Sequence, residues 1–164
     1  MVNRVRLLIL VAVLIPVLIF TGAVLLYDSA PIGSSPGAHF KSFSVGGKTF
    51  PFTYVATNES ALYKGLMGVN VTDTTTELFV FPNASYYGFW MYGMNSSLDI
   101  MWVYVPPGTG TGTFVYLALG VPPCHVTVVC ATYQPAARAN YVIEAKAGFA
   151  AANGIRVGTP VTIG

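Results

Sequence analysis

The fold class is decided by three neighbouring runs of sequence: Glu77-Leu78-Phe79-Val80-Phe81-Pro82, then Phe89-Trp90-Met91-Tyr92-Gly93-Met94, then Leu98-Asp99-Ile100-Met101-Trp102-Val103-Tyr104-Val105. They contain both tryptophans and three of the five methionines of the chain. Short apolar and aromatic runs separated by turn residues are typical of strands. The three runs therefore predict consecutive strands around one hydrophobic core.

The third run has apolar residues on both of its faces. Because successive side chains of a strand alternate, one face carries Leu98, Ile100, Trp102 and Tyr104, and the other carries Asp99, Met101, Val103 and Val105. A strand that is apolar on both faces belongs in the middle of a sandwich or barrel. Asp99 is the lone charge on it, and a buried carboxylate has to be paired or hydrogen-bonded.

Composition narrows the class further. The chain has 164 residues, of which 54% are hydrophobic and 9% are charged, and its formal net charge is +2. This length suits one domain of ordinary size plus a tail. Two of the eight basic residues are Arg4 and Arg6, and the remainder form no basic patch, so we expect no nucleic-acid partner.

The N-terminus predicts a membrane anchor over residues 1–27. Leu7 to Tyr27 carry no charge, and a helix of that length, about 31 Å, matches the hydrocarbon core of a bilayer. The arginines before it place the N-terminus in the cytoplasm and the domain outside the cell membrane. A cleaved signal peptide ending near Thr21-Gly22-Ala23 is the alternative. Residues 28–40 are rich in Gly, Pro and Ser, which predicts a flexible linker. His39 lies near its end and is expected to have no functional role.

The domain itself is expected over residues 41–164. Gly46-Gly47 predicts a hairpin within 41–56, and Thr57 or Asn58 can cap a short helix over 61–67. Further strands are expected over 113–119, 140–147 and 161–163, with a short helix over 148–154. The fold class is thus mainly β: a compact sandwich or barrel-like domain with one or two short helices, preceded by a single transmembrane helix.

Several motifs carry a family resemblance: Gly65-Leu66-Met67, Leu78-Phe79-Val80-Phe81-Pro82, Phe89-Trp90-Met91, Leu98-Asp99-Ile100, Val142-Ile143-Glu144-Ala145-Lys146-Ala147-Gly148 and Gly154-Ile155-Arg156-Val157-Gly158. In this order, from about Phe52 to Ile163, they resemble domain of unknown function 192. The resemblance implies a compact, largely β, often exported domain and leaves its activity open. The family usually has Lys and Asn after its Trp-Met pair, where this chain has Tyr92 and Gly93, and its turn is tighter than the one over 106–112.

Two carboxylates on apolar strands, Asp99 and Glu144, are the candidate catalytic residues. They could act as general acid and base of a hydrolase if their environments separate their pKa values. The alternative is that each accepts backbone hydrogen bonds or pairs with Lys64, Arg138 or Lys146. The sequence offers no evident nucleophile beside them, and nucleophilic catalysis has only two histidines to draw on.

Sulfur-containing residues offer two further interpretations. Outside the cytoplasm, Cys124 and Cys130 are expected to form a disulfide. Met91, Met94 and His125 are soft or borderline ligands, so a copper-handling protein is an alternative function. Methionine in apolar surroundings is more often core filler, and we expect no cofactor.

Two sets of residues predict surface features. Four Asn-x-Ser/Thr sequons, which predict glycosylation, begin at Asn58, Asn70, Asn83 and Asn95. The second run and the residues before it hold more aromatic side chains than one strand face can bury, which predicts an exposed binding platform formed by Tyr86, Tyr87, Trp90 and Tyr92. The sequence therefore favours a membrane-tethered extracytoplasmic binding domain, an accessory subunit with a protein partner in a membrane or envelope assembly.

Overall fold

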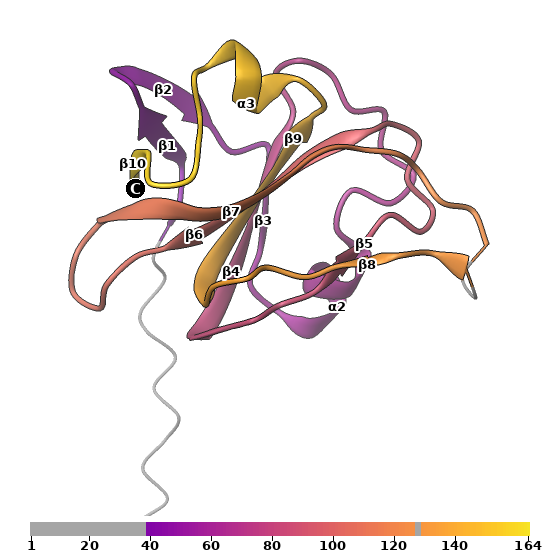
Figure 1. Cartoon of the computed structure of the whole chain (residues 1–164), viewed down its shortest axis with the longest axis horizontal. Coiled ribbons are helices and arrows are strands. Elements are labelled where there is room, and N and C mark those ends of the chain that lie inside the picture. Colours follow the sequence, from indigo (N-terminus) through magenta and orange to yellow (C-terminus); the bar gives the residue numbers. More distant parts are fainter. Residues whose placement is uncertain (1–38, 127–128) are drawn as a thin grey trace, which may run out of the picture. The chain divides into compact units, whose positions relative to one another are not determined.

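The structure is a computed structural model that describes residues 39–126 and 129–164. The main sheet has eight strands: β1 (Ser42–Val45), β2 (Lys48–Pro51), β3 (Tyr54–Ala56), β4 (Thr76–Ser85), β6 (Leu98–Tyr104), β7 (Thr111–Val121), β9 (Ala139–Lys146) and β10 (Pro160–Ile163). Their spatial order is β2-β1-β10-β7-β6-β9-β4-β3, antiparallel except for the parallel pair β3 and β4. The prediction of a mainly β domain is confirmed (Figure 1).

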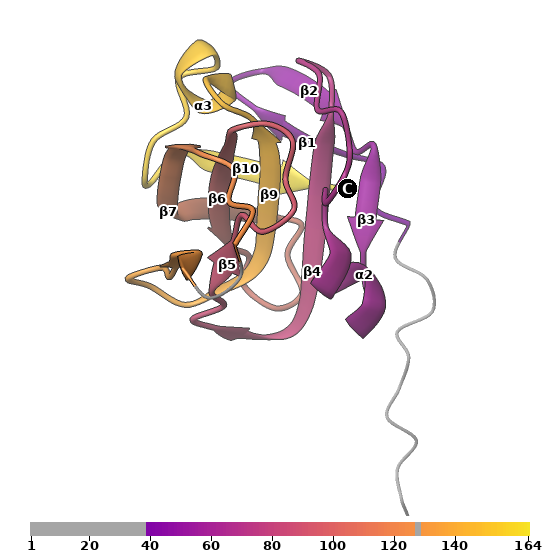
Figure 2. The ribbon, with the colours of Figure 1, turned by 90° about the vertical axis from the view of Figure 1, so that its right-hand side faces the viewer.

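The sheet is open and curled, not a two-sheet sandwich or a closed barrel. Its edge strands, β2 and β3, follow each other in the sequence, and the short connection brings both ends of the sheet together. The Thr53 amide donates to the Thr76 carbonyl at 2.9 Å, and the Thr76 hydroxyl donates to the Pro51 carbonyl at 2.6 Å. Figure 2 shows the resulting curl.

Each face of the sheet carries its own hydrophobic core, because the central strand β6 alternates as its sequence predicts. Met101 and Val103 belong to one core, and Ile100 and Trp102 belong to the other. Helix α3 (Phe149–Ala152) packs on the first core, which we call the α3 face. Helix α2 (Glu59–Lys64) packs on the second, the α2 face, together with the two-stranded sheet of β5 (Phe89–Trp90) and β8 (Thr132–Tyr133).

The second aromatic run departs from the prediction. Only Phe89 and Trp90 are in a strand, and they pair with β8 instead of joining the main sheet. Strand β5 ends at Trp90, Tyr92 forms an isolated bridge with Cys124, and Gly93 then has a positive φ of 69°, which ends the extended backbone. The run thus forms a flap on the α2 face.

The two short helices are confirmed near their predicted positions. Helix α2 begins earlier than expected, because the Asn58 side chain is the N-cap and accepts from the Ala61 amide at 3.0 Å. The Gly46-Gly47 turn joins β1 to β2 with positive φ at both glycines, as the hairpin prediction requires.

The predicted anchor over residues 1–27 lies outside the described residues, as does most of the predicted linker over 28–40. Within the described part of the chain, no helix has the length and apolar character needed to cross a membrane.

Candidate functional site

A cleft of about 240 Å³ opens on the α2 face, between helix α2 and the flap that carries β5. Its walls are largely aromatic: Tyr63, Phe79, Phe81, Tyr87, Phe89, Trp90 and Tyr92. Two charged residues also line it, Lys64 on α2 and Glu144 on β9. The aromatic rings are held against one another, since Tyr63 meets Trp90 edge-on with centroids 6.2 Å apart, and Trp90 meets Tyr92 at 5.6 Å.

Behind Glu144 lies a second carboxylate, that of Glu77 on β4. The two residues are directly opposed in the antiparallel ladder of β4 and β9, so their side chains extend from the same face of the sheet at neighbouring positions. Both are only 4% exposed. Glu77 Oε2 is buried without a hydrogen-bond partner among the described residues, an expensive arrangement for a polar atom.

This environment keeps both carboxyl groups protonated to an unusually high pH. Burial raises the pKa of Glu77 to about 7, partly offset by the positive charge of Lys64. Burial also raises the pKa of Glu144 to about 8, and the neighbouring charge of Glu77 raises it further. Because the two groups interact, they titrate as a pair. Near neutral pH the pair holds about one proton or more.

A glycine at the end of α2 lets the helix approach this pair closely. Gly65 has φ of 49° and ψ of −139°, a conformation that L side chains rarely adopt. A Cβ atom there would lie 3.2 Å from Phe79 Cζ and 3.8 Å from Glu77 Oε2. Gly65 also lines the cleft, so Glu77 Oε2 lies close to a part of the cleft wall that has no side chain.

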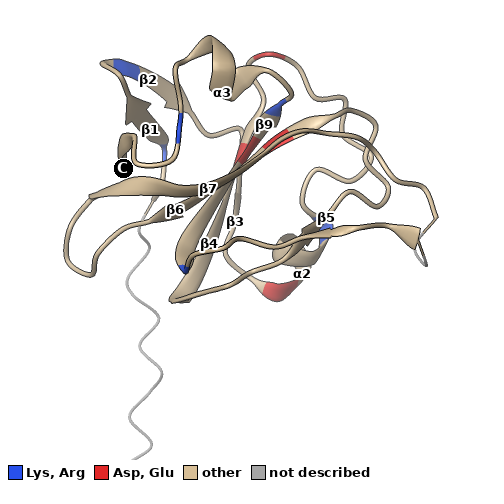
Figure 3. Ribbon diagram, viewed as in Figure 1, with Lys and Arg blue, Asp and Glu red and all other residues tan. Residues whose placement is uncertain are grey.

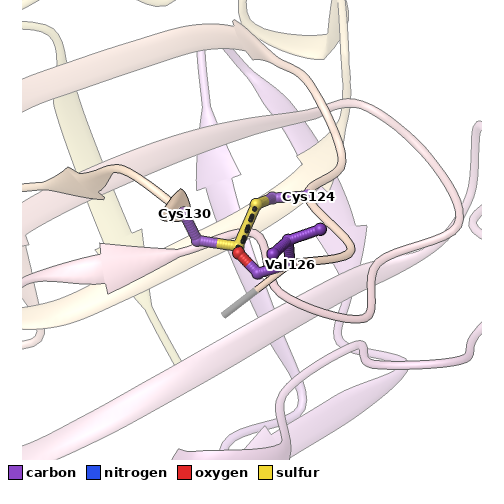
Figure 4. The surroundings of a disulfide bond; sticks show 3 residues. All are labelled: Cys124, Val126 and Cys130. Atoms are coloured by element: carbon purple, nitrogen blue, oxygen red, sulfur yellow. Dashed lines mark hydrogen bonds between the residues drawn. A yellow bond between two sulfur atoms is a disulfide. The ribbon is translucent and has the colours of Figure 1, made fainter. Parts of the chain in front are cut away.

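The flap that supplies Trp90 and Tyr92 is fastened by the segment around the disulfide. The Cys124 amide donates to the Met91 carbonyl, and the Gly93 amide donates to the Cys124 carbonyl, both at 2.9 Å. Cys124 is joined to Cys130, with Cα atoms 5.7 Å apart (Figure 4), so the predicted disulfide is confirmed. Because β8 follows Cys130 closely and pairs with β5, the disulfide loop holds the flap from two sides.

Asp99 does not contribute to the cleft, which corrects the predicted Asp99–Glu144 pair. In the register of β6 and β9, Asp99 opposes Ala145 and Glu144 opposes Ile100, so the two carboxylates extend from opposite faces of the sheet. Asp99 is 1% exposed and accepts three backbone hydrogen bonds. Their donors are the amides of Gly120 at 2.8 Å, Gly148 at 3.0 Å and Ala150 at 2.9 Å.

These bonds match the alternative raised for Asp99, a carboxylate that fixes the backbone. It anchors the first turn of α3 and the end of β7 to the central strand. Glu144 has a different environment. Lys146, one of the cations considered for it, pairs instead with Asp73 at 2.8 Å, and Lys64 makes no ion pair within 4.0 Å among the described residues.

The predicted binding platform is divided. Tyr87, Trp90 and Tyr92 line the cleft, and the Tyr87 ring stacks on Phe81 with centroids 3.6 Å apart. Tyr86 lies outside the cleft, 47% exposed, with the Arg138 guanidinium 5.8 Å from its ring centre.

The other predicted site residues lie away from the carboxylate pair or in the apolar core. Met91 and Met94 are buried in the core of the α2 face, and His125 is exposed. In the part of the chain that the structure describes, no group of three or more His, Cys, Asp or Glu side chains converges on a point where a metal could bind.

The sequon asparagines are all exposed: Asn58, Asn70, Asn83 and Asn95. Figure 3 shows the acidic and basic residues scattered over the ribbon.

Two important residues of the site, one behind the cleft and one in its wall, were not predicted from the sequence. Glu77 stands at the start of the first aromatic run, a position that is typical of the polar end of a strand. Tyr63 lies on α2 and is 65% exposed, which predicts an ordinary solvent-facing residue. The available signal for Glu77 was its place on a buried strand, the same signal that singled out Glu144.

Two solved structures share this fold. One is a protein of unknown function from Novosphingobium aromaticivorans, with 22% identity and a TM-score of 0.61, covering 74% of this chain and 82% of that one. The other is a putative transcription regulator from Sinorhizobium meliloti, with 21% identity and a TM-score of 0.60, covering 76% of this chain and 91% of that one. At these identities the likeness concerns the fold alone.

No curated protein matches the chain. The model of a protein family does match, over residues 43–163, which include every element of the main sheet except the first residue of β1. That family is described as "Uncharacterized ACR" and is known as domain of unknown function 192, the one that the motifs of the sequence resemble. The chain therefore belongs to the domain of unknown function 192 family.

Proposed function

We propose that this protein is a binding domain and that the aromatic cleft of the α2 face is its recognition site. One observation carries the proposal: the cleft is open to solvent, Glu144 lines it, and the buried Glu77 Oε2 beside it has no hydrogen-bond partner among the residues that the structure describes. Burying a carboxyl oxygen without a hydrogen-bond partner destabilises the folded state, so the fold alone does not explain its presence. A ligand that pairs with it would explain why the chain keeps it.

The cleft also has the composition of a recognition site. Aromatic walls supply apolar contact area with little loss of conformational freedom, and a few polar groups fix the orientation of a ligand. The flap that carries three of the aromatic wall residues is tied to the segment around the disulfide, so these residues are held in place before a ligand arrives, which lowers the entropic cost of binding.

The setting we propose for this activity comes from the sequence. An N-terminal anchor would hold the domain on the outer side of the cell membrane, where it would serve as an accessory subunit of a membrane or envelope assembly. The disulfide is consistent with an oxidising compartment.

The test is the native mass of the full-length protein extracted in mild detergent from its own membrane, followed by identification of co-purifying chains. We expect a discrete species well above 17.4 kDa, the mass of one chain. Trp90→Ala should release the partner, whereas Tyr86→Ala, a surface aromatic outside the cleft, should retain it. A lone protomer, or equal retention by both variants, would contradict the proposal.

A second candidate is an enzyme that uses Glu77 and Glu144, in place of Asp99 and Glu144, for proton transfer. It is favoured by the raised pKa values of about 7 and about 8, because a general acid or base works best with a pKa near the working pH. It predicts turnover of chromogenic esters or glycosides that Glu144→Gln abolishes and Asp99→Asn, in folded protein, preserves. Turnover that survives Glu144→Gln would exclude this mechanism.

A further inference from the structure

We infer that the cleft binds a primary alkylammonium group, the chemistry of a lysine side chain or of a free aliphatic amine. The ammonium would lie against the Glu77–Glu144 pair, and its alkyl stem would lie along the aromatic walls. This inference rests on the proposed binding function and names its ligand class.

The carboxylate pair calls for a positive charge. Glu77 and Glu144 are opposed in the ladder and both are buried, and like charges directly across a strand pair are destabilising. A neutral ligand could hydrogen-bond to Glu77 Oε2 but would leave the repulsion between the ionised groups. A cation at the same place removes the repulsion and provides the missing hydrogen-bond donor at once.

The donor set favours an organic cation over a metal ion. Calcium takes six to eight oxygen ligands and magnesium takes six in octahedral geometry, whereas no third His, Cys, Asp or Glu side chain joins this pair within the described residues. An ammonium group needs only three acceptors. Two carboxylates offer enough of them.

The walls supply the rest of the recognition. A cation over the face of tryptophan or tyrosine is attracted by the ring, and Tyr63, Trp90 and Tyr92 line the cleft side by side. Leu62, Leu66 and Met94 also line the cleft and are apolar. They can cover an alkyl stem in the way that lysine stems lie along apolar surface.

None of the described residues supplies this cation. Lys64 lines the same cleft and its charge lowers the pKa of Glu77, yet it forms no ion pair with either carboxylate within 4.0 Å among the described residues. Lys64 is exposed, so its charge remains in water. The carboxyl groups of Glu77 and Glu144 therefore hold their protons until a cation binds and displaces them.

This displacement gives the inference a signature in pH. The titratable groups that lie opposite Glu77 or Glu144 in the sheet, or line the cleft, are Glu77, Lys64, Tyr54, Tyr63, Tyr87 and Tyr92. Of these, Glu77 changes charge near neutral pH together with Glu144. Binding of an amine should therefore release protons, and its affinity should rise by up to about tenfold per pH unit from about pH 6 to about pH 8.

The experiment is calorimetric titration of the full-length protein with n-butylammonium and with n-butanol, its neutral counterpart of similar size. We expect n-butylammonium to bind at least about tenfold more tightly at pH 8. It should release protons, measured by repeating the titration in buffers of different ionisation enthalpy. The double variant Glu77→Gln with Glu144→Gln should lose this preference, and Trp90→Leu should weaken n-butylammonium while keeping the proton release.

One more probe, Nα-acetyl-lysine methylamide, distinguishes the two sources of the amine. Nα-acetyl-lysine methylamide binding as well as n-butylammonium would indicate a lysine of a partner protein, whereas exclusion of this bulkier probe would indicate a free amine. Equal binding of n-butanol and n-butylammonium, or no proton release, would overturn the inference while leaving the proposed function in place. No binding of either probe, with a partner still lost in Trp90→Ala, would also overturn it alone. If neither probe binds and Trp90→Ala still retains the partner, both the inference and the proposed function would be overturned.

Discussion

Glu144→Gln should make the protein more stable at alkaline pH, because the ionised carboxylate is held in the folded state at a cost. The pKa of Glu144 rises from its ordinary value of 4.5 to about 8 on burial beside Glu77. Each pH unit between these values corresponds to about 1.4 kcal/mol. The folded state therefore loses about 5 kcal/mol when this group ionises, a large share of the 5–15 kcal/mol by which domains are typically stable.

The direction follows from proton binding. Between about pH 4.5 and about pH 8 the folded protein holds a proton on Glu144 that the unfolded chain has released, so the free energy of unfolding falls as pH rises through this window. Glutamine carries no charge at any pH, and its amide can donate to Glu77 Oε2. We expect the two proteins to be similar near pH 5 and the variant to be several kcal/mol more stable near pH 9.

Urea unfolding of the full-length protein at pH 5, 7 and 9 measures this directly, with the midpoint and slope fitted at each pH. Glu59→Gln is the matched control, since it removes an exposed carboxylate from the first turn of α2. It should leave the pH dependence as it is in the parent protein. Parallel curves for Glu144→Gln and the parent would refute the reasoning, because they would mean that Glu144 ionises as freely in the folded state as in the unfolded one.

Three further changes test the framework around the cleft. Asp99→Asn should lower the free energy of unfolding by about 2–4 kcal/mol in urea titrations, because three backbone amides lose a charged acceptor, while n-butylammonium affinity stays unchanged. Gly65→Ala should cost about 1–3 kcal/mol by the same assay, because its φ of 49° strains a side chain; an unchanged midpoint would contradict this conformation. Replacing Cys124 and Cys130 by serine should cost about 2 kcal/mol and speed amide hydrogen exchange at Gly93, and equal exchange in the double variant would show that the disulfide does not hold the flap.

The sequence predicts local features of this domain well because those features depend on neighbouring residues. The two faces of β6, the Gly46-Gly47 hairpin and the cap at Asn58 each follow from a rule that spans a few positions. The open sheet does not follow from such a rule. Its strand order places β10 between β1 and β7, and no pattern within one strand records its neighbours.

Which carboxylates share the site could not be predicted either, because this too depends on how the strands pair. Asp99 and Glu144 look alike in the sequence, each a single carboxylate on an apolar strand. Only the register between β6 and β9, which aligns Asp99 with Ala145, shows that they lie on opposite faces. Glu77 and Glu144 come together through a register between strands that are distant in the sequence, so a search for nearby acidic pairs could not find them.

The three buried carboxylates of the sheet show how a structural role can be separated from a binding role. Asp99 has three amide donors and stabilises the ends of α3 and β7 that it touches. Glu77 is as deeply buried and has an oxygen without any partner among the described residues. If both served the fold, replacing either by its amide would destabilise the domain. If Glu77 is kept for a ligand, Glu77→Gln should stabilise the free protein and weaken binding, whereas Asp99→Asn should destabilise the protein and leave binding unchanged.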